Sequence, residues 1–547
     1  MASTAESGHV PVSCGKRPPA VPLLFRKTGL LALVTAALSA SGPAFGQSVY
    51  GGGGYGWGTY GGGAVSMFGA PQTSFSTAFA GEESKTRETR KGEWVVEPRL
   101  TVGETITDNV TLAPPGKEEW DMVSQITPGI GIRGDGPRLQ GSLDYQAQSL
   151  FYVRNPNDNG VFHQLGADGT AEVLRHHVFV DASAAYTQQI ISPTGPVPTS
   201  NIVPTSNRTN VGSFRVSPYA VQRFGTFADG RLRYTYDRVQ YSTGSLADSE
   251  TNGIHALLKS GPQFDDLGWK LRYHRSKERL QGFPDNRFER YSGELSYRLG
   301  AKTEAFGTLG YEDNKYQTRR PGMDLSSRFW ETGLRYHPTL RTSLEGAYGK
   351  RYFGHTWRAK LRHHTRDSVW FLQYAESIET TSGVENQNLQ LRLTDSSGNI
   401  ITDSQGNPVT VQVPFTLRIQ DVFLRRRLNA EITFHTAKSR IRFSGYRETR
   451  HYQRTGVKEK GYGAGAGLNW KVAPRTRAIT RLSWDHHDLA FLANRKDDYW
   501  RVGARLARKL RPKLISALDY EYLRRDSNIR SAEYRQNAVS LLLTKVF

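Results

Sequence analysis

The sequence has almost no cysteine and no long apolar runs. Its 547 residues contain one cysteine, Cys14, which lies upstream of the apolar segment described below. If that segment is removed on export, the mature chain holds neither a disulfide nor a thiol nucleophile. No internal stretch approaches the roughly 18–20 consecutive apolar residues that a membrane-spanning helix requires, and the mean hydropathy is −0.55. A disulfide-stapled scaffold, a thiol enzyme and a helical membrane protein are therefore excluded.

Recognisable enzyme motifs are also missing. None of HExxH, CxxC, GxSxG or a phosphate-binding loop occurs in a usable context. The adjacent histidine pairs at 363–364 and 486–487 would each present only one ring to a given face of a strand. We therefore predict no enzymatic activity, no catalytic residues, no metal site and no cofactor. A barrel hydrolase built from residues such as His274, His364 and Ser444 is the least favoured alternative.

The N-terminal residues are typical of an export signal. Basic residues at 16, 17, 26 and 27 precede the apolar core TGLLALVTAALSA at 28–40, and the small residues Ala44 and Gly46 stand before Gln47. This order predicts a signal peptide at 1–46 that is cleaved before Gln47, with an uncleaved anchor as the alternative. Residues 47–92 include the run YGGGGYGWGTYGGG and are predicted to form a glycine-rich, flexible periplasmic segment.

The net charge of +21 is the next constraint. In a cytosolic protein this excess would indicate nucleic acid as the partner. The export signal argues against that partner, and we expect no nucleic acid. The expected partners are instead outer-membrane lipid and lipopolysaccharide, an anionic polysaccharide, or small anions.

From residue 93 onward, apolar and polar residues alternate with a period of two. Near the C-terminus, Leu518 and Tyr520 share one face of a predicted strand, and Asp519 and Glu521 share the other. Short turns and long polar connections follow one another along most of this region. The pattern predicts an all-β fold: a transmembrane, outer-membrane antiparallel β-barrel of about 22 strands (range about 18–24) over 93–547. A soluble sandwich is the alternative, but its turns need not sort by length.

The last strand ends in NAVSLLLTKVF. Leu541, Leu543 and Phe547 share one face, and Lys545 interrupts it. A barrel closes when its last strand pairs with its first. A terminal strand that ends in phenylalanine resembles the signal read by the barrel-assembly machinery of the outer membrane, which we expect as a partner.

Residues 94–190 and a later short piece carry a further likeness. The pieces TDNV at 107–110, TPGI at 127–130, LDYQAQSLFY at 143–152 and SPY at 217–219 resemble the PEP-CTERM system-associated outer membrane protein family. This resemblance implies an exported barrel linked to exosortase and exopolysaccharide loci in Gram-negative bacteria. The family has no defined biochemical activity, so the resemblance implies location and context rather than mechanism.

Cationic side chains alternate with apolar ones along several predicted strands. If the apolar faces meet lipid, the cations point into the lumen, since charge on the lipid side would cost roughly 2–4 kcal/mol each. A basic lumen favours anionic solutes; the alternative is that the cations pair with lumenal acids such as Glu294, Glu345, Asp519 and Glu521. The predicted lumen-lining basic residues are Lys270, Arg272, Arg358, Lys360, Arg362, Arg425, Arg427, Arg440, Arg442, Arg501 and Arg505.

Two further features bear on function. Tyr152, Trp330, Tyr336, Trp470 and Trp500 are predicted to form interfacial aromatic girdles, with sugar-stacking platforms in the lumen as the alternative. The connection 380–419 is too long for a plain turn and could constrict the lumen or cap it.

The favoured hypothesis is a porin-like channel that passes an anionic or hydrophilic substrate in exopolysaccharide export. A non-conducting surface-binding or assembly barrel with a plugged lumen is the second.

Overall fold

A computed structural model describes residues 93–244, 246–319, 324–384, 420–489 and 494–547. The predicted signal peptide (1–46) and glycine-rich segment (47–92), and most of the connection 380–419, lie outside these described residues. Across the described residues, no helix reaches the length and apolar character needed to cross a membrane.

Most of the described residues form β-strands; two short 3-10 helices, η2 (Pro156–Asp158) and η3 (Arg530–Ala532), and a helical turn at 381–384 lie in the connections. The strands are β1 (Trp94–Thr107), β2 (Asp121–Asp135), β3 (Leu139–Tyr152), β4 (Gly160–Leu174), β5 (Val178–Ile190), β6 (Arg208–Phe224), β7 (Ala228–Tyr241), β8 (Ser249–Ser260), β9 (Leu267–Leu280), β10 (Asn286–Gly300), β11 (Thr303–Lys315), β12 (Ser327–Thr339), β13 (Thr342–Arg351), β14 (Gly354–His364), β15 (Ser368–Thr380), β16 (Val422–His435), β17 (Ser439–Tyr452), β18 (Lys458–Ala473), β19 (Thr476–Leu489), β20 (Arg495–Arg511), β21 (Leu514–Ser527) and β22 (Tyr534–Val546).

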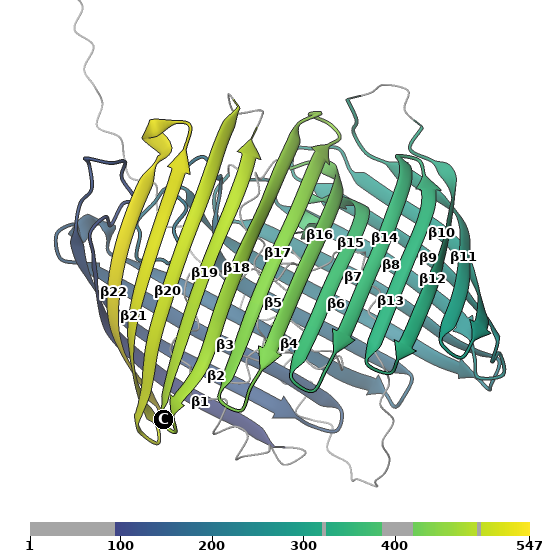
Figure 1. Cartoon of the computed structure of the whole chain (residues 1–547), viewed down its shortest axis with the longest axis horizontal. Coiled ribbons are helices and arrows are strands. Elements are labelled where there is room, and N and C mark those ends of the chain that lie inside the picture. The colour runs from purple at the N-terminus through teal and green to yellow at the C-terminus, as the bar shows by residue number, and fades with distance from the viewer. Residues whose placement is uncertain (1–92, 245, 320–323, 385–419, 490–493) are drawn as a thin grey trace, which may run out of the picture. The chain divides into compact units, whose positions relative to one another are not determined.

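The strands make one closed sheet (Figure 1). Each strand runs antiparallel to the strands before and after it in sequence, and β1 pairs antiparallel with β22 from Arg99↔Val546 to Thr107↔Ala538. Closure leaves no free sheet edge, which is the condition for spanning a membrane with strands. The predicted all-β outer-membrane barrel of about 22 strands is confirmed, and this fold places the chain in the outer membrane of a Gram-negative bacterium.

With two exceptions, 261–266 and 352–353, the connections sort by length between the two ends of the barrel. One end carries the short connections 136–138, 175–177, 225–227, 261–266, 301–302, 340–341, 365–367, 436–438, 474–475 and 512–513. The other end carries 108–120, 153–159, 191–207, 242–248, 281–285, 316–326, 352–353, 381–421, 453–457, 490–494 and 528–533. In outer-membrane barrels the short turns face the periplasm, so both ends of the described barrel, β1 and β22, open on the periplasmic side.

Alternation along each strand separates an outer face from a lumenal face. On β20, Trp500 and Leu506 are 40% and 47% exposed, whereas Arg501 and Arg505 are 2% and 3% exposed. Because neighbouring side chains on a strand point to opposite faces, the apolar residues face lipid and the arginines face the lumen. The cost of charge against acyl chains decides this orientation.

Aromatic rings border the outer apolar face. Tyr462, Trp484 and Trp500 lie on the neighbouring strands β18, β19 and β20, with successive ring centroids 5.6 Å and 6.0 Å apart. The expected girdle residues that are exposed are Trp330, Tyr336, Trp470 and Trp500. The prediction for Tyr152 is wrong: this side chain is buried on the lumenal face, and its hydroxyl donates to the carbonyl of Ile202 at 2.7 Å.

The seam between β1 and β22 is closely packed. A Cβ atom on Gly103 would lie 2.3 Å from the Leu542 Cδ2 atom and 2.9 Å from the Leu541 carbonyl oxygen, so only glycine fits at this position. Thr101 and Thr544 hydroxyls lie 2.9 Å apart across the seam. The predicted assembly-signal residues Leu541, Leu543 and Phe547 are exposed on the outer face. Their recognition by the assembly machinery stays a prediction.

Candidate functional site

Many of the predicted lumen-lining cations are ion-paired. Lys270 and Arg272 on β9 each lie 2.8 Å from a carboxylate oxygen of Glu294 on β10. Arg335 on β12 joins Glu294 at 2.7 Å and Glu304 on β11 at 2.5 Å. These contacts form an alternating row of charges across neighbouring strands of the lumenal wall.

The row continues through Arg358 on β14, which lies 2.5 Å from Glu331 and also pairs with Glu345. On this wall each positive charge is matched by a carboxylate within reach, so the row itself supplies little excess field. Of the two hypotheses for these cations, pairing with lumenal acids describes this part of the wall better than a free anion-binding surface does.

A second group of predicted cations is buried near the long connections. Arg425 on β16 lies 3.0 Å from Glu379 on β15 and 3.0 Å from Glu448 on β17. Arg427 also pairs with Glu448, as does Arg450 at 2.5 Å. Sequence reasoning missed Arg450 because the alternation of β17 was followed only at its other end.

Two further cations pair on the β19–β21 wall. Arg501 lies 2.7 Å from Asp485, and Arg505 makes a two-bond contact with Asp519. Two-bond arginine–carboxylate contacts fix geometry as well as charge. Asp519 was among the acids expected to offset lumenal charge.

Near the short turns of β14–β20 the lumenal charges do not balance. Arg442 lies 3.4 Å from Glu431, and the register places Arg442 and Arg481 on either side of Gly467. Among the described residues, the other acids beside this stretch of wall are Glu345 on β13, opposite Lys360, and Asp519 and Glu521 on β21, so the cations outnumber the acids. We call this set of cations the basic crescent: Lys360, Arg362, Arg440, Arg442, Lys471, Arg477, Arg481, Arg505 and Lys509.

The facing wall, β1–β8, differs. There the lumenal cations have nearby carboxylates: Arg99 lies 2.6 Å from Asp144, and Arg233 lies 2.7 Å from Asp181. Arg223 and Lys259 approach the two oxygens of Asp229 at 3.1 Å and 3.3 Å. The lumen is therefore charge-balanced on one wall and basic on the other, at the periplasmic end.

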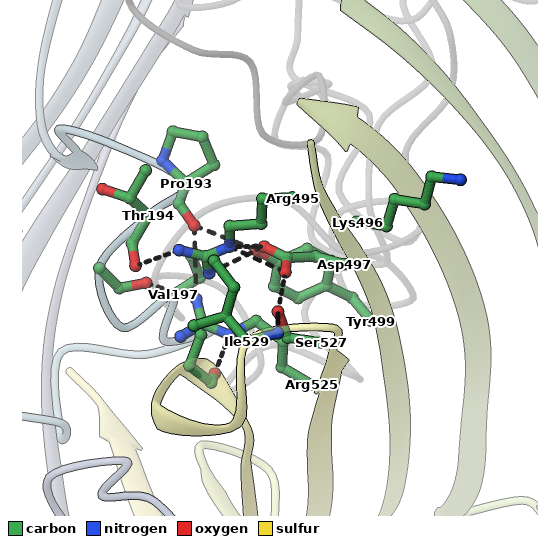
Figure 2. A network of polar contacts seen from close by, with 12 residues as sticks. Pro193, Thr194, Val197, Arg495, Lys496, Asp497, Tyr499, Arg525, Ser527 and Ile529 are labelled. Atoms are coloured by element: carbon green, nitrogen blue, oxygen red, sulfur yellow. Dashed lines mark hydrogen bonds and ion pairs between the residues drawn. The ribbon is translucent and has the colours of Figure 1, made fainter. Parts of the chain in front are cut away.

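The connection 191–207, between β5 and β6, reaches wall residues that come from distant parts of the sequence. On one side, Arg495 Nη1 donates to the Thr194 carbonyl at 3.0 Å and the Tyr499 hydroxyl to the Pro193 carbonyl at 3.2 Å. Arg525 Nη1 donates to the Gly195 carbonyl at 2.6 Å. Figure 2 shows these side chains of β20 and β21 converging on the backbone of the connection.

The same connection contacts the other side of the seam. The Tyr152 hydroxyl donates to Ile202, and Asn201 Nδ2 donates to Gln148 Oε1 at 3.0 Å. The connection therefore touches β3 on one side of the strands β22, β1 and β2, and it touches β20 and β21 on the other side. A segment that holds both sets of lumenal side chains lies inside the barrel, near the mouth with the long connections.

Internal contacts keep the inward connection in shape. Asn207 Oδ1 accepts from the Ser192 amide at 2.9 Å, and Asn207 Nδ2 donates to the carbonyls of Ser192 at 2.7 Å and Pro196 at 2.8 Å. Val197 and Val203 are fully buried. Sequence reasoning treated 190–207 as an ordinary polar connection. The valines and prolines of this connection could have indicated a buried segment, because a connection that runs over the surface has no need of apolar residues.

Asp497 orients Arg495, one of the residues that anchor the inward connection. It is fully buried, and its carboxylate accepts from Arg495 Nε at 2.9 Å and from the Ser527 hydroxyl at 2.6 Å (Figure 2). A buried carboxylate with these donors holds the guanidinium in one rotamer. The inward connection is thus held by side chains of the strands β3, β20 and β21, and its Val203 also lies in a buried cluster with Leu112 of the connection 108–120.

No hydrolase cluster forms from the expected residues. His274, His364 and Ser444 lie on β9, β14 and β17, which are not neighbours, and His274 Nδ1 lies 2.9 Å from His255 Nδ1. Among the described residues, no group of three or more His, Cys, Asp or Glu side chains could hold a metal ion.

No family model matches the chain, and no curated protein sequence matches it. Three solved structures illustrate its structural similarities. The siderophore receptor PirA from Acinetobacter baumannii has a TM-score of 0.48 at 9% identity, covering 84% of this chain and 81% of that one. The FrpB iron transporter from Neisseria meningitidis scores 0.47 at 10% identity, covering 84% and 83%. The ferric enterobactin receptor PfeA from Pseudomonas aeruginosa scores 0.45 at 12% identity, covering 84% and 82%. Similarity at this level carries no argument about what this chain binds.

Proposed function

We propose that this outer-membrane barrel is a porin-like channel for anionic, hydrophilic solutes. The observation that carries the proposal is the basic crescent on the lumenal face of β14–β20. Two unit charges 10 Å apart interact by about 1.7 kcal/mol at an effective dielectric of 20 and by about 0.4 kcal/mol in water. A lumenal wall that carries more cations than acids at one mouth therefore raises the local concentration of anions severalfold.

The position of the crescent favours export. It lies near the short turns, which face the periplasm, so an anionic solute leaving the periplasm would meet it first. The resemblance of the first third of the barrel to PEP-CTERM system-associated outer membrane proteins supports an acidic exopolysaccharide as the substrate. A flexible polyanion can also touch several cations at once, which a single small anion cannot.

Ion selectivity in planar bilayers tests this proposal. The folded barrel should conduct, and its reversal potential in a salt gradient should indicate anion preference. A crescent variant, K360Q/R440Q/K471Q/K509Q, should lower the anion-to-cation permeability ratio severalfold. The matched control, R238Q/K277Q/R287Q/R524Q, removes the same number of cations from the outer face and should leave the ratio unchanged. A barrel that stays closed in repeated preparations, or equal shifts in both variants, would refute the proposal.

The inward connection 191–207 supports a second candidate, a non-conducting barrel that binds partners at the surface. Its contacts with β3, β20 and β21 narrow the outer mouth. If the wild-type barrel does not conduct but a variant with a loosened connection does, the constriction sets the closed state. A barrel that is closed in both forms would favour the surface-binding function.

A further inference from the structure

A group of cations lies on the outer face of β16, β17 and β18, close to the long connections. Arg426 is 52% exposed, and the other members are also exposed. They share the face of Leu428, Phe443 and Tyr462, all of which are exposed, so they point away from the lumen. We call this group the outer basic patch: the cations Arg426, Arg447, Lys458 and Lys460, with His451 beside them.

The strand register places these cations side by side. Arg426 pairs with Thr449, and Thr449 pairs with Lys460. One step further out, His451 pairs directly with Lys458. Side chains directly opposite in antiparallel strands have Cβ atoms about 4.5–5.5 Å apart. Residues distant in sequence thus form one compact cationic surface.

Few acids compensate this surface. Glu376 lies 3.4 Å from Arg426, and Asp488 stands opposite Lys460 in the register of β18 and β19. The other nearby glutamates, Glu448 and Glu459, are buried on the lumenal face. The patch therefore keeps a positive excess that a multivalent anion outside the barrel would neutralise.

The height of the patch on the barrel identifies that anion. On β18, Trp470 and Tyr462 mark the two edges of the apolar belt, about 20 Å apart along the barrel axis for a rise of ~3.3 Å per residue and a tilt of about 40°. Lys460 and Lys458 come directly beyond Tyr462 on the side of the long connections. The long connections face outward from the cell, so the patch lies at the level of outer-leaflet headgroups.

The surface below the patch is suited to acyl chains. Phe443 and Leu428 are exposed on the same face. Leu428 lies directly opposite Arg447 and one side-chain row inward of Arg426, and Phe443 lies two rows inward of Arg447. A ligand with phosphates above and acyl chains below would contact both parts at once. From this geometry we infer that the outer basic patch is a binding site for a phosphorylated glycolipid of the outer leaflet, with lipopolysaccharide as the natural source. The inference depends on the orientation of the barrel and not on what passes through it.

The test measures binding of purified diphosphoryl lipid A to the folded full chain in detergent, by native mass spectrometry and by titration. The variant R426Q/R447Q/K458Q/K460Q should bind about tenfold to a hundredfold more weakly, since each cation near a phosphorylated surface contributes about 1 kcal/mol and partial compensation reduces the sum. Wild type should also prefer diphosphoryl to dephosphorylated lipid A, and the variant should lose that preference.

The control variant R238Q/K277Q/R287Q/R524Q removes the same number of outer cations, but each of these already faces a carboxylate, at 3.8 Å, 2.7 Å, 2.5 Å and 2.7 Å respectively. It should bind lipid A as wild type does. Equal loss in both variants, no loss in either, or wild-type binding that ignores the phosphates would overturn the inference. If the quadruple patch variant fails to fold, K458Q/K460Q tests the same site and should lose about half of the effect on a logarithmic scale.

Discussion

The Asn207 side chain closes the base of the inward connection 191–207, and replacing it should loosen this connection. Asn207 makes three hydrogen bonds that close the base of the connection: one with the Ser192 amide and two with the carbonyls of Ser192 and Pro196. Alanine at this position would remove all three. The partners lie in a partly buried region, so they would either stay unpaired or separate to meet water.

The magnitude follows from the bonds. At about 1 kcal/mol for each neutral hydrogen bond, Asn207→Ala should destabilise the ordered connection by about 3 kcal/mol. This corresponds to a change of roughly a hundredfold in the equilibrium between its ordered and open forms. The wall donors Arg495, Tyr499 and Arg525 would remain, but they bind the backbone of a segment that no longer holds its shape.

Hydrogen exchange measures this equilibrium directly. The Ile191 amide donates to the Asn207 carbonyl at 2.9 Å, so its protection reports the base of the connection. In Asn207→Ala this amide should exchange roughly a hundredfold faster, and the mean conductance or its fluctuations should rise. The matched control is Asn528→Ala, which removes two hydrogen bonds, from the Lys496 amide at 2.9 Å and to the Asn494 carbonyl at 3.1 Å, in an exposed connection. Exchange at Ile191 that stays within threefold of wild type in Asn207→Ala would refute the reasoning.

Three further outcomes are expected. Gly103→Val should reduce the yield of folded barrel strongly, because a Cβ atom there meets Leu542 Cδ2 at 2.3 Å and backbone at 2.9 Å; a wild-type yield in a heat-modifiability assay would contradict this. Deleting Phe547 removes the hydrogen bond from its backbone N–H to the Pro98 carbonyl at 2.9 Å and should slow assembly in cells more than folding in detergent. Equal rates in the two settings would argue against a recognition role. Burial raises the pKa of Asp421 above its ordinary value of 3.8, so the folded state holds this proton more tightly than the unfolded state. The resulting stabilisation is present at low pH and is lost as pH rises through the raised pKa. Asp421→Asn should flatten that pH dependence in a thermal-unfolding series, and an unchanged profile would count against the assignment.

The sequence alone sufficed for the barrel because alternation is a local property. Trp500, Arg501 and Val502 alternate between the two faces of β20. This alternation depends only on the pleat of the strand and on the cost of placing charge in lipid. The same holds for the sorting of connections by length, since each hairpin needs only its own turn signals. The prediction was wrong where one local pattern fits two environments. A tyrosine at a strand end, such as Tyr152, can lie at a lipid interface or can donate a hydrogen bond to an inward segment.

The ion pairs of the lumenal wall and the inward position of the connection 191–207 could not be predicted from local patterns. Whether Arg272 stands free or meets Glu294 depends on the register between β9 and β10, and a shift of one residue would send one partner to lipid. Arg495 and Thr194 are brought together only by closure of the sheet, because the strands that carry them are far apart in the chain. The outer basic patch has the same origin, since Arg426 and Lys460 become neighbours only through the register of β16–β18.

The sequence by itself therefore determined the strands, their number within a narrow range, their two faces and the membrane they occupy, because each of these follows from the contact of single side chains with lipid or water. Only the tertiary structure decided which cations are neutralised, where positive charge remains and which connection enters the lumen, because charge balance and constriction are properties of residues that meet across strands after the barrel has closed.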